Sequence, residues 1–121
     1  MARVLLADDD AAMRDMVRRS LGADGHTVTV ANDGQDALDQ MQGADQPFDI
    51  LVTDVQMPAV DGISLATQML ELHPGLKVVL MSGLQSEMAR ASNLKAQGAQ
   101  FISKPFTLEQ IRSVVRSALA A

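Results

Sequence analysis

The chain has 121 residues, of which 47% are hydrophobic and 2% aromatic, with a formal net charge of -5 and no cysteine. Its length predicts one domain over residues 1–121 with an ordinary core, and no apolar run approaches the roughly 18 residues that cross a bilayer. Because nucleic-acid binding needs a basic surface or stacking platforms, we expect a soluble protein with neither nucleic acid nor membrane as a direct partner.

Short apolar runs and amphipathic segments alternate along the whole chain. The apolar runs have the character of strands buried on both faces of a sheet, and they lie at residues 3–7, 27–30, 50–52, 77–81 and 100–103. Apolar residues at helical spacing follow each strand, near residues 13–21, 34–41, 63–70, 86–95 and 107–118. Strict alternation of this kind predicts an α/β fold, a doubly wound five-stranded parallel sheet with five helices on its two faces.

Several helix boundaries and faces can be assigned from single residues. Asp10 is the expected N-cap of the first helix, and Thr107 with Gln110 has the spacing of a capping box at the start of the last helix. The helix expected at 86–95 has the thinnest apolar stripe of the five, formed by Met88, Ala91 and Leu94. The first helix is expected to turn Met13, Met16, Val17 and Leu21 inward, and both histidines, His26 and His73, are expected on the surface near turns.

Acidic and hydrogen-bonding residues follow the predicted strands at their carboxyl ends. Asp8 and Asp9 follow the first strand, Asp54 the third, Ser82 the fourth and Lys104 the fifth. Because parallel strands all point the same way, these residues should converge at one edge of the sheet, where open α/β sheets bind their ligands.

The residue types at this edge indicate a particular chemistry. Three carboxylates repel one another unless a hard cation lies between them, and oxygen ligands suit Mg²⁺. Lys104 and Ser82 would add a positive charge and a hydroxyl donor. A carboxylate nucleophile, a metal and donors for the equatorial oxygens are what phosphoryl transfer requires.

Each of these residues also has an ordinary structural interpretation when taken singly. The pair Asp8 and Asp9 can be an N-cap with a solvated neighbour, Ser82 can belong to a turn, and Lys104 can end an exposed loop. Phe101 is more typical of a core than of a switch. Their convergence at one sheet edge is what favours the functional interpretation.

Four stretches, ADDD, TDVQMPAVDG, LMSG and FISKPF, occur in that order along the whole chain, which resembles a response-regulator receiver domain of two-component signalling. The resemblance implies a flavodoxin-like sheet of strand order 2-1-3-4-5. It also implies a cis bond between Lys104 and Pro105, a cofactor Mg²⁺, and a protein that catalyses only its own phosphorylation and dephosphorylation.

The resemblance assigns roles to the matching residues. Asp8 and Asp9 would hold Mg²⁺, and Asp54 would both bind the metal and accept the phosphoryl group from a histidine kinase or a histidine phosphotransfer protein. The backbone carbonyl of Gln56 would complete the metal site. The residues that contact the phosphoryl group would be Ser82 and Lys104.

The resemblance also implies a switch and a control of phosphoryl lifetime. Phosphorylation would move Ser82 and Phe101 together and alter the face formed by the fourth helix, the fifth strand and the fifth helix, where an unknown protein target binds. Position 82 holds Ser where Thr is commoner in the family, and position 101 holds Phe where Tyr is common. Gln56 and Leu84 are expected to flank the path of the hydrolytic water, with apolar Leu84 slowing hydrolysis.

The sequence also predicts a cellular location and leaves three competing classes of protein. The amino-terminal stretch MARVLLADDD is unlike a signal peptide, so we expect a cytoplasmic location, and the chain resembles the stand-alone type of receiver. A phosphatase of the haloacid dehalogenase type would have a second acid where Gln56 stands. A flavin binder would need a hydroxyl-rich loop and aromatic rings, and a degenerate receiver would serve as a structural interaction module only.

Overall fold

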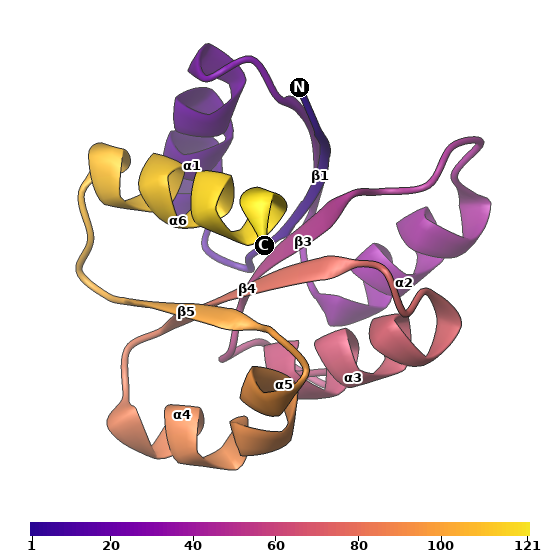
Figure 1. Ribbon diagram of the computed structural model, residues 1–121, viewed down its shortest axis with the longest axis vertical. Helices are drawn as coiled ribbons and strands as arrows, with labels where there is room; N and C mark the ends of the chain where they lie inside the picture. Colours follow the sequence, from indigo (N-terminus) through magenta and orange to yellow (C-terminus); the bar gives the residue numbers. More distant parts are fainter.

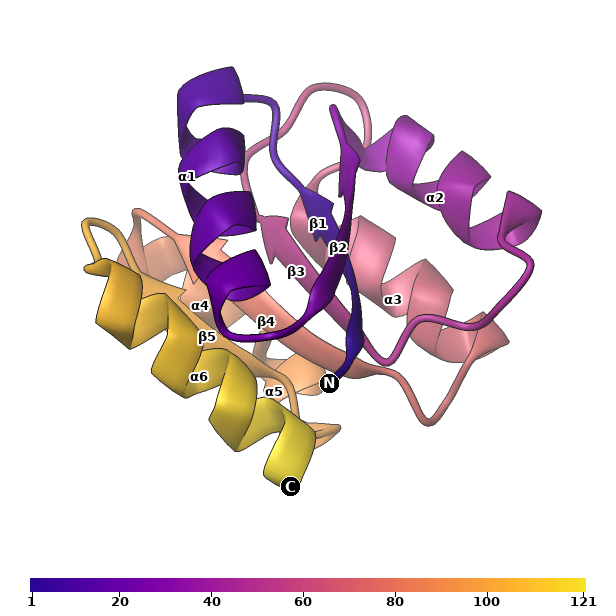
Figure 2. The same ribbon diagram turned by 90° about the horizontal axis from the view of Figure 1, so that it is seen from above.

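The computed structural model describes residues 1–121, and its centre is a parallel five-stranded sheet of order β2-β1-β3-β4-β5 (Figure 1, with β2 labelled in Figure 2). The strands are β1 (Arg3–Ala7), β2 (Thr27–Ala31), β3 (Ile50–Asp54), β4 (Lys77–Ser82) and β5 (Gln100–Ser103). The expected fold class and strand order are therefore confirmed. Each predicted strand is present, and three of the five extend one or two residues beyond the apolar run that predicted them.

Helices cover both faces of the sheet. They are α1 (Ala11–Ala23), α2 (Gly34–Gly43), α3 (Gly62–Leu72), α4 (Gln85–Arg90), α5 (Ser92–Ala96) and α6 (Leu108–Ala120). Figures 1 and 2 show α1 and α6 side by side on one face, with α2, α3 and the α4–α5 segment on the other. None of these helices has the length and apolar character that a membrane crossing requires.

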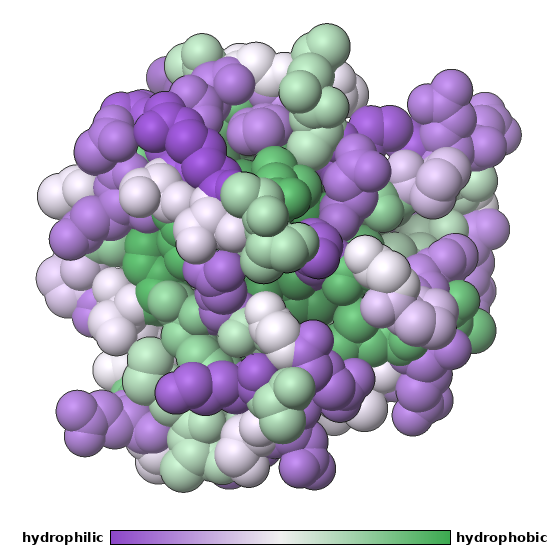
Figure 3. Space-filling view, viewed as in Figure 1, coloured by the Kyte–Doolittle hydropathy of each residue, from purple (hydrophilic) through white to green (hydrophobic).

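The central strands bury both of their faces, which is why they appear in the sequence as continuous apolar runs. Val4 and Leu6 of β1 pack toward α1 and α6, and Leu5 and Ala7 pack toward the opposite helices. On the view in Figure 3, hydrophilic side chains dominate the rim and hydrophobic ones gather toward the middle, where the sheet lies. Because successive side chains of a strand point to opposite faces, the sheet packs against one hydrophobic cluster on each face.

The predicted helix caps are present. Asp10 caps α1 by accepting hydrogen bonds from the backbone N–H groups of Ala12 and Met13. Thr107 and Gln110 form the reciprocal capping box of α6, which satisfies backbone donors that a helix start otherwise leaves unpaired.

The single helix expected at 86–95 is wrong, because α4 and α5 are two short helices divided at Ala91. The structure therefore has six helices and not five. Ala91 and Leu94 are buried as expected, but Met88 is half-buried and Glu87 points inward in its place. Helix continuity depends largely on packing of an apolar face, and this segment offers too little apolar surface to hold one straight helix.

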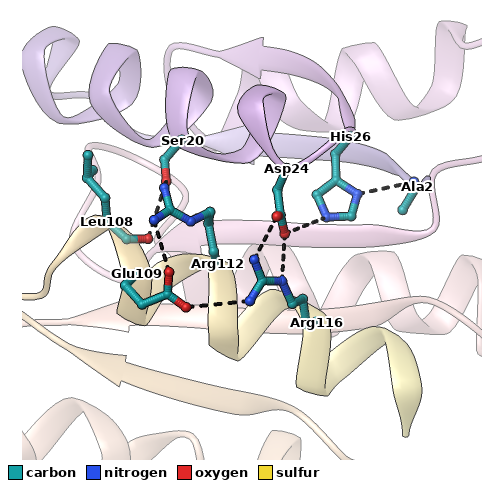
Figure 4. A network of polar contacts seen from close by, with 8 residues as sticks. All are labelled: Ala2, Ser20, Asp24, His26, Leu108, Glu109, Arg112 and Arg116. Carbon is teal, nitrogen blue, oxygen red and sulfur yellow. Dashed lines mark hydrogen bonds and ion pairs between the residues drawn. The ribbon is translucent and has the colours of Figure 1, made fainter.

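The inward position expected of Met16 is also wrong, because its side chain is 36% exposed. Ser20 is buried on α1 between the two helices, and its hydroxyl donates to the carbonyl of Leu108 at 3.3 Å and accepts from Arg112 at 3.1 Å (Figure 4). A polar contact that reaches from α1 to α6 thus forms part of the packing between these helices.

His26 is not the surface side chain expected from its place near a turn. Its imidazole is 8% exposed, and Nδ1 accepts a hydrogen bond from the backbone N–H of Ala2 at 3.2 Å. Beside it, the Arg116 guanidinium donates to both carboxylate oxygens of Asp24, at 2.8 and 2.7 Å (Figure 4). These hydrogen bonds lower the pKa of Asp24, and they join the end of α1 to α6.

Candidate functional site

The carboxyl end of β3 is held in place by a very close backbone approach. A Cβ atom built on Gly62 would lie 2.1 Å from the carbonyl oxygen of Asp54, far inside van der Waals contact. The N–H of Gly62 donates to the carbonyl of Val55 at 2.8 Å, and the N–H of Val55 donates to Met81 of β4 at 3.0 Å. Only glycine fits at position 62 without displacing the strand end that carries Asp54.

The loop between β3 and α3 is fixed at two further points. Ala59 has a φ of 64°, in the left-handed region that costs an L-residue free energy. A Cβ on Gly34, at the start of α2, would lie 2.4 Å from the carbonyl oxygen of Val60. The loop is therefore anchored on the start of α2 through Val60, while Gln56, Pro58 and Ala59 are exposed.

Three carboxylates meet at this edge of the sheet, as the topology predicts. Asp8, Asp9 and Asp54 each offer an oxygen within 4.8 Å of the others. One carboxylate oxygen of Asp8 accepts from the N–H of Asp10 at 2.9 Å, whereas the other, Oδ2, is buried without a hydrogen-bond partner. An unpartnered buried carboxylate oxygen is costly, so this arrangement calls for a cation or a proton.

The charges in the cluster are only partly balanced. Lys104 places its Nζ 3.0 Å from Oδ2 of Asp54. Burial nevertheless raises the pKa of Asp54, with Lys104 opposing it. Burial also raises the pKa of Asp8, to about 6, and the negative charge of Asp54 adds to the rise. Both carboxyl groups are harder to ionise than usual, and a nearby cation would reverse that.

The residues present fit a magnesium ion. All candidate donors are oxygens, which hard cations prefer, and Asp8 Oδ2 is free to serve as a ligand. The backbone of Gln56 is close enough to the Asp54 carboxylate to lower its pKa, so this residue lies beside the cluster. Its proposed contribution of a carbonyl ligand stays a prediction.

An open cleft of about 600 Å³ adjoins the acidic cluster. Its lining is mainly polar, and it includes Asp9, Asp54, Gln56, Glu87 and Lys104. An open, hydrophilic cleft with a buried carboxylate at its base is accessible to a small anion or to a side chain of another protein. It lacks the apolar walls that most organic ligands need.

Ser82 is near the site, but its hydroxyl has a different partner from the one expected. Both Ser82 and Glu87 are buried, at 3% and 4% exposure, and Ser82 Oγ donates to Glu87 Oε1 at 2.7 Å. The carbonyl of Leu84 lies 2.9 Å from the same hydroxyl. Glu87 was not among the predicted site residues. The sequence feature that could have identified it is an acidic residue in the first turn of the helix that follows Ser82.

The positions of Leu84 and Phe101 are compatible with their expected roles, and these roles stay predictions. The Leu84 side chain is 52% exposed and precedes α4 as its N-cap residue. Phe101 is half-buried against the hydrophobic cluster on the α2–α3 face. It pairs with Leu80, two residues before Ser82 on the neighbouring strand.

Further contacts at the site were not predicted. Arg14 of α1 donates to the backbone carbonyl of Asp8 at 2.8 Å, and Arg90 of α4 donates to the Asp61 carboxylate at 2.8 Å. The predicted cis bond between Lys104 and Pro105 is confirmed.

Comparison with known proteins agrees with this geometry. The family described as the response regulator receiver domain matches residues 4–116. Among curated proteins, the response regulator MprA of Mycobacterium leprae (strain TN) is 38% identical over 117 residues, which are 97% of this chain and 50% of that protein. MprA of Mycobacterium tuberculosis (strain ATCC 25177 / H37Ra) gives the same figures. The chain spans about half the length of these relatives.

Solved structures give the same result. The chemotaxis protein CheY4 of Vibrio cholerae has a TM-score of 0.82 and 30% identity, with 98% of both chains covered. The receiver domain of NtrX from Brucella abortus has a TM-score of 0.85, with the same identity and coverage. A receiver domain protein from Clostridium thermocellum has a TM-score of 0.89 over 99% of this chain and 95% of its own, and at 21% identity it supports the fold alone. The chain belongs to the response regulator receiver domain family of two-component systems.

Proposed function

We propose that this receiver domain accepts a phosphoryl group on Asp54 from a phosphohistidine of a histidine kinase or a histidine phosphotransfer protein. The observation that carries the proposal is the Asp54 carboxylate at the base of an open polar cleft, with Lys104 Nζ 3.0 Å away and the Asp8 and Asp9 oxygens within 4.8 Å. No other carboxylate in the structure combines an accessible cleft, an adjacent amine and two neighbouring acids.

In the proposed reaction a carboxylate oxygen of Asp54 attacks phosphorus, the bond from phosphorus to the donor imidazole nitrogen breaks, and an acyl phosphate forms. Lys104 favours the ionised carboxylate that must attack, and it can donate to a phosphoryl oxygen afterwards. Asp8, Asp9, Asp54 and the Gln56 carbonyl would hold Mg²⁺, which neutralises charge on the phosphoryl oxygens when bound. Water attack on the same phosphorus reverses the modification, so the chain needs no other substrate.

The consequence of phosphorylation would be a change in protein binding. We propose that Ser82 and Phe101 respond to the phosphoryl group and alter the surface formed by α4, β5 and α6, as expected for the fourth helix, fifth strand and last helix of the fold. The target on that surface is a protein, and the location proposed for the exchange is the cytoplasm, where a kinase supplies the group.

The cleft favours this function over a phosphatase acting on small molecules. Such an enzyme needs a second acid to protonate the leaving group, and Gln56 stands two residues after Asp54 where that acid would be. The few apolar residues of the lining also offer little to recognise an organic leaving group.

The test is incubation with Mg²⁺ and acetyl phosphate, followed by intact-mass measurement. The parent should gain one phosphoryl group, and the gain should vanish in chelator and in Asp54→Asn. Asp45→Asn is a matched control, because Asp45 is exposed on a loop away from the cleft, and it should be labelled like the parent. Equal labelling of Asp54→Asn and the parent would refute the proposal.

A further inference from the structure

The contact between Ser82 and Glu87 is unusual because both side chains are buried and one of them is an acid. Glu87 lies in the first turn of α4, and the hydroxyl of Ser82 donates to its Oε1 at 2.7 Å. The nearby amine, Lys104, is paired with Asp54. The hydrogen bond from Ser82 is therefore the side-chain contact that stabilises the buried Glu87 carboxylate, and such charge-assisted bonds are strong.

A serine hydroxyl has a single hydrogen, which it can donate to one strong acceptor at a time. Ser82 Oγ has two acceptors within reach, Glu87 Oε1 at 2.7 Å and the Leu84 carbonyl at 2.9 Å, and we assign the hydrogen to the carboxylate because it is the closer and the stronger acceptor. If Ser82 donates to a phosphoryl oxygen on Asp54, Glu87 loses it. Glu87 and the phosphoryl group are thus competitors for the same donor.

We propose that Glu87 is a latch for the unphosphorylated state, which holds Ser82 and α4 in the resting position and is released when the phosphoryl group takes the Ser82 hydroxyl. This inference rests on the proposed function of Asp54. After release, the Glu87 carboxylate would be buried without a partner, in a cleft that it shares with Asp54 and the new negative charge. Because a buried unpaired charge is strongly unfavourable, Glu87 must move toward solvent and carry α4 with it.

The build of α4 permits this movement. The helix has six residues and ends at the break near Ala91, and its N-cap residue makes no side-chain capping bond. Its other polar attachment is the ion pair of Arg90 with Asp61, in which the Arg90 side chain is 58% exposed. Exposed pairs of this kind contribute little, so the buried Glu87 contact is the main polar attachment of the helix to the site.

The first measurement is amide hydrogen exchange at residues 85–91 without any phosphoryl group. Glu87→Gln keeps an acceptor without the charge, and Glu87→Ala removes both. Exchange in this segment should be faster in both variants, more so in Glu87→Ala. Glu71→Gln, which removes one charge from an exposed position on α3, should leave it unchanged. Unchanged exchange in both Glu87 variants would overturn the latch.

The second measurement is the affinity for beryllium fluoride with Mg²⁺, a mimic of the phosphoryl group, followed by the same exchange signal. In Glu87→Gln the mimic does not have to displace the Ser82 hydroxyl from a charged acceptor. This variant should therefore bind the mimic roughly tenfold more tightly than the parent. Glu71→Gln should bind it like the parent. A Glu87→Gln affinity equal to or weaker than that of Glu71→Gln would contradict the proposal.

Loss of negative charge near the cleft could also favour an anion without any latch, and a double-mutant cycle separates the two effects. In a Ser82→Ala background the latch cannot form, so adding Glu87→Gln should then change mimic affinity by less than about twofold. A full tenfold gain in that background would mean that Glu87 acts by repulsion alone.

The outcomes distinguish this inference from the proposed function. If the parent is labelled on Asp54 but the Glu87 variants behave like Glu71→Gln, only the latch is refuted. If the parent neither binds the mimic nor takes up a phosphoryl group, the proposed function is wrong and the latch falls with it.

Discussion

Gly62 lies so close to Asp54 that a Cβ at position 62 would be 2.1 Å from the Asp54 carbonyl oxygen. The start of α3 and the end of β3 therefore fit together only because residue 62 has no side chain. The conformation of the candidate phosphoryl acceptor thus depends on a residue that has no chemistry of its own.

Gly62→Ala should lower the free energy of unfolding by about 1–3 kcal/mol, because the backbone must shift to relieve the overlap, and it should slow labelling of Asp54. Denaturant unfolding and acetyl phosphate uptake measure the two effects. Gly43→Ala is the control, since nothing lies within 4 Å of a Cβ built there. If the two variants are equally stable and equally labelled, the close approach of Gly62 to Asp54 contributes neither to stability nor to phosphorylation.

Ala59→Gly should stabilise the protein slightly. Left-handed backbone costs an L-residue about 1–2 kcal/mol, and the added flexibility of glycine in the unfolded chain costs about 0.4–1 kcal/mol. The net gain should lie between about 0 and 1.6 kcal/mol. Ala12→Gly, at an exposed position of α1, should instead destabilise by about 1 kcal/mol. Chemical denaturation of both variants compares them, and a loss of stability in Ala59→Gly would show that the loop carries no strain there.

Asp8→Asn should make the metal-free protein more stable at pH 7. The rise of the Asp8 pKa to about 6 disfavours the ionised native state by up to roughly 3 kcal/mol, and Asn should recover about 1–2 kcal/mol of this because it also needs hydrogen-bond partners. Added Mg²⁺ should raise the melting temperature of the parent but not of the variant. Thermal unfolding in chelator and in Mg²⁺ tests both statements, and a variant stabilised by Mg²⁺ like the parent would exclude Asp8 as a ligand.

The same pKa predicts a pH dependence of stability. Between pH 6 and pH 4 the native Asp8 carboxyl binds its proton more tightly than the unfolded one, because its pKa is raised from 3.8 to about 6. The contribution of Asp8 to stability should therefore increase as pH falls through this window. Other acids titrate there too, so the measurement is the difference in unfolding free energy between the metal-free parent and Asp8→Asn. The stability advantage of Asp8→Asn over the parent should decrease as pH falls and pass through zero before pH 4, and a difference that stays constant with pH would contradict the burial of Asp8.

Leu84→Glu should shorten the lifetime of the phosphorylated protein several-fold, because a carboxylate can orient the attacking water where an apolar side chain excludes it. The Leu84 side chain is 52% exposed, so stability should change little. Leu72→Glu is the matched control, with Leu72 56% exposed at the end of α3. First-order decay after removal of the donor compares the three proteins, and a Leu84→Glu decay no faster than that of the parent would leave Leu84 as a packing residue.

Two kinds of feature could be predicted from the sequence. The first have a signal in neighbouring residues, and the second follow from the parallel arrangement of the strands. Continuous apolar runs such as 50–52 identify strands buried on both faces. Once the strands are parallel, Asp8, Asp9, Asp54 and Lys104 must meet at one edge, and the structure brings them together. The caps at Asp10 and Thr107 follow from residue type and spacing.

The features that could not be predicted depend on partners distant in the sequence or on small differences in packing. Met16 fits the apolar periodicity of α1, yet Ser20 lies inside because Arg112 and the Leu108 carbonyl of α6 satisfy its hydroxyl. Glu87 is an acid, and its burial is possible only because Ser82 donates to it. No periodicity contains that information, which is why an inward Met88 was expected where Glu87 is the buried residue.

Phosphoryl transfer to Asp54 is tested most directly by locating the phosphoryl group in the intact parent protein. Treatment of the phosphorylated chain with borohydride reduces an aspartyl phosphate to homoserine, which peptide mass spectrometry locates along the sequence. Phosphorylation of Asp54 predicts homoserine at position 54 alone, dependent on Mg²⁺ during labelling. Homoserine at position 8 or 9, or a phosphoryl group that survives borohydride as an ester on Ser82, would contradict it.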